Sequence, residues 1–84
     1  MNIDKSMIGK ILRKMRLDNN FSQRELAEKL FVTQTTLSDW ERAYRQPTFD
    51  SIAKIAYYCD YTISFTNNKT GEVITTENIV RKDL

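Results

Sequence analysis

Apolar side chains recur at intervals of three or four residues in four stretches between residues 7 and 58. This spacing is typical of helices that bury one face in a core. It predicts helices over residues 7–18, 23–30, 34–42 and 49–58. The side chains expected to face inward are Ile8, Ile11, Leu12, Met15, Leu26, Ala27, Leu30, Leu37, Ile52, Ile55 and Ala56, with Phe49 beside them.

Residues with cap-forming side chains stand where these helices should begin. Ser22 and Glu25, three residues apart, form the pattern of a capping box. Hydroxyl and carboxylate oxygens can accept the unpaired amides of a first helical turn. The other candidate starting residues are Thr33 for the third helix, Pro47 and Thr48 for the fourth, and Asp4 or Ser6 for the first.

The period of the pattern changes to two after residue 60. Tyr61, Ile63 and Phe65 alternate with polar residues, the run NNKTGE is typical of a turn, and the apolar stretch VIT follows. We therefore expect a β-hairpin over residues 61–76, followed by a last helical turn or a frayed end. The predicted fold class is mainly α. It is a compact bundle of four to five short helices, with a helical core over 7–58, in a single domain spanning 1–84.

Composition excludes most catalytic chemistry. The chain has no histidine, which is the commonest general base and metal ligand. Gly9 and Gly71 are the only glycines, so no phosphate-binding loop exists, and no acidic cluster has metal-ligand spacing. Cys59 lies among apolar residues and is expected to fill the core. We predict no enzyme, no catalytic residue, no metal and no cofactor.

Net charge and hydropathy limit the classes of partner that the chain can bind. A formal charge of +2 and a pI near 8.8 allow a polyanionic partner without requiring one. No stretch is long and apolar enough for a membrane span, and the first residues lack the apolar run of a signal peptide. We expect a cytoplasmic protein without a membrane partner.

The stretch TQTTLSDWE is unusual for a helix because it is rich in Thr, Ser and Asp, which are mediocre helix formers. If it is a helix, one of its faces carries short polar side chains and no long apolar ones. With Leu37 at the centre of the buried side, steps of about 100° place Trp40 and Glu41 beside it. Such a polar face suits the major groove of DNA, where each base pair presents its own donor and acceptor pattern. A merely solvated face is the alternative. The residues of this face are Gln34, Thr35, Ser38, Asp39 and Arg42.

The run SQRELAEKLFVTQTTLSDWERAYRQP resembles the helix-turn-helix domain of phage repressors, Cro proteins and related bacterial regulators, the XRE family. The resemblance covers roughly residues 7–65. It implies a fold like that of the lambda repressor and a transcriptional regulator, in the first instance a repressor, that binds specific double-stranded DNA. The matching residues are Ser22, Gln23, Leu26, Ala27, Thr33, Leu37, Trp40, Glu41 and Pro47.

The resemblance also implies individual roles. It places Gln23 against a DNA phosphate and the recognition helix, and a helix N-terminus does favour an anion. It implies a structural ion pair between Arg16 and Glu41. Tyr44 and Arg45, directly after the third helix, are placed to reach the DNA backbone, although an ordinary surface loop is the alternative. Lys10, Arg13 and Lys14 could reach flanking phosphates or simply be solvated.

Two positions depart from the family pattern. Phe31 and Ala43 stand where the family often has glycine, and both positions can require a positive φ. We expect a cost of about 1 kcal/mol at such a site. Asn20, after the first helix, is a further candidate for left-handed backbone.

One recognition helix reads only a few base pairs, so family members usually bind inverted repeats as twofold dimers. The hairpin is the expected dimerisation element, although it could instead cover its own core. Its candidate residues are Ile63, Phe65, Val73 and Ile74. Other functions stay open: an antitoxin that binds a toxin protein and represses its own operon, a restriction–modification controller, or a protein-interaction module without DNA binding.

Overall fold

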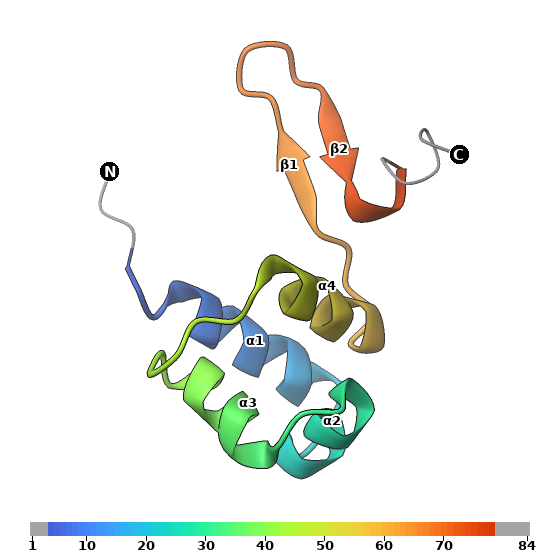
Figure 1. The fold of residues 1–84 in the computed structure, drawn as a ribbon. Helices are drawn as coiled ribbons and strands as arrows, with labels where there is room; N and C mark the ends of the chain where they lie inside the picture. Colours follow the sequence, from blue (N-terminus) through green and yellow to red (C-terminus); the bar gives the residue numbers. More distant parts are fainter. Residues whose placement is uncertain (1–3, 79–84) are drawn as a thin grey trace.

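The computed structural model describes residues 4–78. The helices are α1 (Met7–Asp18), α2 (Gln23–Leu30), α3 (Gln34–Glu41) and α4 (Phe49–Tyr58), and the strands are β1 (Ser64–Thr66) and β2 (Val73–Thr75). The helices form one body, and the two antiparallel strands project from it on the side of α4 (Figure 1). The predicted fold class, mainly α with a C-terminal hairpin, is confirmed.

Local side-chain bonds start the helices. The Ser22 hydroxyl accepts the Glu25 amide and the Glu25 carboxylate accepts the Ser22 amide, both at 3.0 Å, which completes the predicted capping box. Thr33 and Thr48 cap α3 and α4 as predicted. At α1 the Ser6 hydroxyl makes no cap bond, and Asp4 accepts the Ser6 amide instead.

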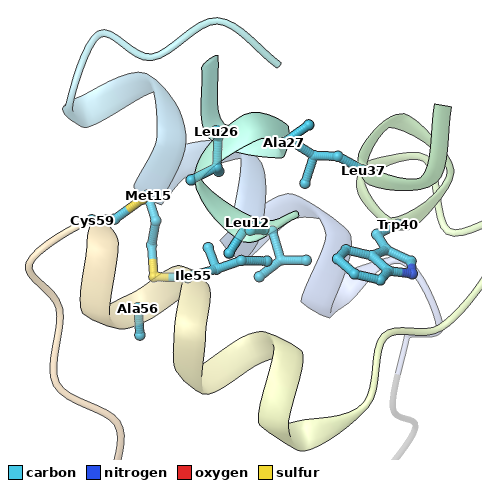
Figure 2. Packing of buried hydrophobic residues seen from close by; sticks show 10 residues of the cluster. Leu12, Met15, Leu26, Ala27, Leu37, Trp40, Ile55, Ala56 and Cys59 are labelled. Carbon is cyan, nitrogen blue, oxygen red and sulfur yellow. The ribbon is translucent and has the colours of Figure 1, made fainter. Parts of the chain in front are cut away.

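The core lies where the four helices meet, and every helix contributes to it (Figure 2). Most of the residues expected to face inward are buried, and Trp40 and Cys59 are buried with them, as predicted. Burial raises the pKa of the Cys59 thiol, so the thiol stays protonated at neutral pH. The buried apolar residues are Leu12, Met15, Leu26, Ala27, Leu30, Leu37, Trp40, Ile55, Ala56 and Cys59.

Two residues expected to face inward remain exposed. Ile11 is 44% exposed and Phe49 is 48% exposed. Together with Ile52 they line an apolar groove of about 340 Å³ between α1, α4 and the base of the hairpin. The periodicity predicted the correct helix faces, but in residues 4–78 no further element covers this end of the core.

The hairpin is shorter than predicted. Pairing begins at Ser64, and the register places Phe65 opposite Ile74. Before β1, Ile63 packs against the helical core, and the Tyr61 hydroxyl donates to the Asp18 carboxylate of α1. That bond lowers the pKa of Asp18, and the neighbouring Lys14 lowers it further. After β2, Thr75 and Asn78 cap a helical turn reciprocally, which fits the predicted last turn.

Among residues 4–78, four non-glycine residues have positive φ. Phe31 and Ala43, the two departures from the family pattern, have φ of 58° and 63°, and Asn20 has 58°. The left-handed conformations expected at all three are confirmed. The fourth, Asp60 at 61°, was not predicted. In residues 4–78 no helix has the length and hydropathy needed to cross a membrane.

Gly9 lets α1 approach the end of α3. A Cβ atom at this position would lie 2.5 Å from the Glu41 carbonyl oxygen and 2.7 Å from that of Trp40. Both contacts are with backbone atoms, which cannot swing aside as a side-chain end could. A glycine inside a helix is normally unfavourable, so here packing outweighs helix propensity.

We predict that Gly9→Ala lowers the free energy of unfolding by about 1–3 kcal/mol, because the added methyl group forces α1 and α3 apart. Urea denaturation followed by circular dichroism measures the effect. Arg13→Ala, at an exposed site on the same helix, is the matched control and should change stability little. A Gly9→Ala variant more stable than the wild type would show that helix propensity dominates and that the contact is not tight.

Candidate nucleic-acid interface

Helices α2 and α3 form a helix-turn-helix unit. The turn begins at Phe31, whose left-handed backbone ends α2. The Val32 amide then donates a hydrogen bond to the Ala27 carbonyl at 3.1 Å. Thr33 then caps α3 by accepting the Thr36 amide at 3.1 Å. The two helices therefore leave the turn in a fixed relative orientation, with the start of α3 at the surface.

The structure places the predicted polar face of α3 opposite its buried side. Leu37, Trp40 and Glu41 are buried. Gln34 and Thr35 are exposed, whereas Ser38 and Asp39 are half-buried. Helix α3 ends at Glu41 rather than Arg42, because Arg42 is its C-cap residue. Arg42 remains exposed at the end of the face.

Asp39 has a role that the sequence did not indicate. Its side chain is only 18% exposed, and its carboxylate pairs with the Arg42 guanidinium at 3.4 Å. The same guanidinium lies 4.5 Å from the centre of the exposed Tyr44 ring. The Asp39 backbone carbonyl accepts the amides of Tyr44 and Arg45 at 2.9 and 3.3 Å. Asp39 therefore organises the end of α3 and the loop after it.

A buried polar network joins three helices. Arg16 Nε donates to Glu41 Oε2 at 2.7 Å and Arg16 Nη2 to Glu41 Oε1 at 2.9 Å, which is the ion pair that the resemblance implies. Arg16 Nη1 also donates to the Phe21 carbonyl at 2.8 Å, before α2. The Arg16 and Glu41 side chains are only 8% and 2% exposed. The charges are thus paired and hydrogen-bonded, as burial requires.

Gln23 joins this network from the first turn of α2. Its side-chain Nε2 donates to Glu41 Oε1 at 3.2 Å. One N–H of the amide is used in this bond, and the second can still donate to an acceptor outside the protein. Gln23 is half-buried, so Glu41 holds its amide in one orientation at the surface beside α3.

The other sequence-predicted residues lie around this unit. Arg45 is exposed in the loop after α3. Lys10, Arg13 and Lys14 are exposed on α1, where Lys14 pairs with Asp18 at 3.1 Å. The structure therefore brings Gln23, the polar face of α3 and the Tyr44–Arg45 loop to neighbouring positions. The candidate dimerisation residues lie apart from them, on the hairpin.

The chain is similar in sequence to known helix-turn-helix proteins. The model of the helix-turn-helix family HTH_3 matches residues 12–65, more than half of the chain. The HTH-type transcriptional regulator ImmR of Bacillus subtilis is 39% identical over 49 residues. That match covers 58% of this chain and 39% of ImmR, so the chain spans about two fifths of that relative's length.

Solved structures share the fold. The restriction-modification controller protein C.AhdI from Aeromonas hydrophila is 28% identical with a TM-score of 0.64, covering 69% of this chain and 84% of that chain. The N-terminal DNA-binding domain of SinR from Bacillus subtilis is 32% identical with a TM-score of 0.60, covering 66% and 81%. SinR has also been solved in complex with DNA.

We predict that Glu41→Gln lowers the free energy of unfolding by about 3–5 kcal/mol, because it leaves the buried Arg16 charge without its partner. Urea denaturation measures the loss. The matched control is Glu28→Gln, which removes a pair with Arg24 in which both side chains are largely exposed and should change stability little. Equal effects of the two substitutions would contradict a structural role for the buried pair.

Proposed function

This chain belongs to the helix-turn-helix family of Cro/C1-type transcriptional regulators, and we propose that it binds a specific DNA sequence as a homodimer and represses transcription by occluding that site. The observation that carries the proposal is the polar face of α3. It lies between Gln23 on one side and the Tyr44–Arg45 loop on the other. A helix of this kind can enter the major groove while flanking groups bind the phosphates.

The exposed start of α3 supplies the base contacts in this proposal. Gln34 can pair bidentately with adenine, and the Thr35 methyl group can contact the methyl group of thymine. Ser38 can bond to either kind of base edge. Their short or flexible side chains let the helix approach the bases closely.

Asp39 and Arg42 act as a pair in the proposed complex. An isolated carboxylate on this face would repel phosphate, but Arg42 neutralises it at 3.4 Å. This pairing supports DNA binding over a protein-interaction module, because the acidic residue is the feature of the face that argues against DNA. Asp39 can still accept from a cytosine amino group.

Three groups hold the DNA backbone in the proposal. Gln23 offers its remaining amide N–H to a phosphate, next to the free backbone amides at the start of α2. Arg45 and Tyr44 offer a guanidinium and a hydroxyl on the other side of the recognition helix. These contacts set the orientation of α3 and carry no sequence information.

The exposed apolar surface around the hairpin supports the homodimer. Phe65 is 52% exposed, and Val73 and Ile74 are 47% and 37% exposed. Phe65 and Ile74 are cross-strand partners, and the Phe65 ring lies 6.0 Å from that of Phe49. Ile63 is half-buried and packs against the helical core of its own chain. The nearby groove lined by Ile8 and Ile11 extends the same apolar surface. A second copy that covers it would bury the part of the core left open here.

The other functions that the sequence left open differ in the binding partner that each requires. The antitoxin role needs a toxin protein in addition to DNA, and it stays a prediction. Both roles share the DNA interface proposed above.

We expect Gln34→Ala and Arg45→Ala to weaken DNA binding in different ways. Gln34→Ala should reduce discrimination by about 1–3 kcal/mol at one or two base pairs only. Arg45→Ala should weaken binding to all sequences alike and lower the slope of log affinity against log salt by about one. Fluorescence anisotropy on the preferred duplex and its single-base variants separates the two. An unchanged base preference in Gln34→Ala would contradict the assignment of the readout face.

We expect light scattering at tens of micromolar to give twice the 9.9 kDa mass of one chain. Ile74→Asp should shift the protein to the monomer, because it places a charge in the proposed interface. Asn68→Asp adds the same charge in the hairpin turn and is the matched control. A monomeric wild type at this concentration would contradict dimerisation through the hairpin.

A further inference from the structure

A second apolar groove lies between the C-terminal halves of α2 and α4. It has a volume of about 330 Å³, and we call it the Phe31 groove. Its walls include the rings of Phe31, Tyr57 and Tyr58, and two lysines, Lys29 and Lys54, stand among them. Neither α3 nor the hairpin contributes to it. The groove therefore shares no residue with the proposed DNA interface or with the proposed dimer interface.

Phe31 is unfavourable for the fold in two respects. Its backbone has φ of 58°, a left-handed conformation that suits glycine. Its side chain is 93% exposed, so it buries almost no apolar surface within the chain. Tyr57, across the groove, is 79% exposed. Folding alone gives no reason for an aromatic side chain at residue 31. Exposed aromatic groups gathered around one groove are typical of a protein-binding surface.

The charges of the groove have one sign. The Lys29 ammonium lies 5.4 Å from the centre of the Phe21 ring and 6.0 Å from that of Tyr58. No carboxylate is among the residues described as lining the groove. Of the acidic residues of α2, Glu28 accepts from Arg24 and Glu25 accepts from Ser22. Lys29 lies close enough to Glu25 to contribute to lowering the pKa of that carboxyl, after the larger effect of the Ser22 hydrogen bonds. An apolar floor with a cationic rim is complementary to an apolar side chain flanked by carboxylates.

We propose that the Phe31 groove binds a segment of another protein that presents an aliphatic or aromatic side chain between Asp or Glu residues. The apolar side chain would lie against Phe31 and Tyr57. The carboxylates would pair with Lys29 and Lys54, and the Tyr57 hydroxyl could donate to one of them. The residues of this surface are not those proposed to bind DNA, so the inference does not rest on DNA binding.

The test pans a random dodecapeptide library, displayed on phage, against the full-length protein. Enriched peptides should combine acidic residues with an aromatic or large aliphatic one. Labelled synthetic copies are then titrated by fluorescence anisotropy. Phe31→Gly should weaken binding by about tenfold or more, as expected for the loss of a central aromatic contact. Lys54→Glu should also weaken it, whereas Lys69→Glu, in the hairpin turn, should leave it unchanged.

Phe31→Gly also separates binding from folding. Glycine relieves the left-handed backbone, so the melting temperature should rise while peptide binding weakens. Duplex DNA binding is measured in Tyr57→Ala, which removes a groove ring on α4, leaves the turn before α3 unchanged and should match the wild type. Failure of this inference and failure of the DNA proposal are therefore distinguishable.

Several results would overturn the proposal. One is a library with no enriched sequence. Another is a set of peptides that bind the Phe31→Gly variant as tightly as the wild type. A third is a set of peptides that lack acidic residues and bind the Lys54→Glu variant as tightly as the wild type. Binding of single-stranded oligothymidylate that is lost in Phe31→Gly would assign the groove to nucleic acid instead.

Discussion

The buried ion pair between Arg16 and Glu41 sets the arrangement on which the rest of the structure depends. It joins α1 to α3, and its carboxylate also accepts from Gln23 at the start of α2. A buried pair is tolerated only when its remaining donors and acceptors are satisfied. In residues 4–78 no buried side-chain nitrogen or oxygen lacks a hydrogen-bond partner. The three helices must therefore keep one relative position, and that position places Gln23 beside the polar face of α3.

Local signals made most of the fold predictable. The capping box at Ser22, the Thr caps and the 3.6-residue period act within a few residues, so the bounds of α1, α2 and α4 follow from the sequence. The start of β1 and the exposure of Ile11 depend on how the hairpin leaves the helices, which no local pattern encodes. The requirement for glycine at residue 9 also depends on tertiary packing, because the backbone of α3 leaves no room for a Cβ atom there.

The candidate site was predictable to the level of helix faces. Steps of 100° were enough to separate the arc of Gln34 and Thr35 from the buried side of α3. They could not show that Asp39 pairs with Arg42, or that Arg42 lies over the Tyr44 ring, because these contacts depend on side-chain rotamers and on the loop after α3. The Phe31 groove could not be predicted from the sequence for a similar reason, because the residues that line it come from two helices. One small bundle thus carries three separate surfaces, of which the polar face of α3 carries the proposed function.

That proposal is tested most directly by selection from a random duplex pool with the full-length protein at near-physiological salt. A homodimeric regulator should enrich an inverted repeat whose half-sites lie about one DNA turn apart, as two α3 helices related by a twofold axis require. No enrichment, with only weak and salt-sensitive retention of DNA, would contradict it.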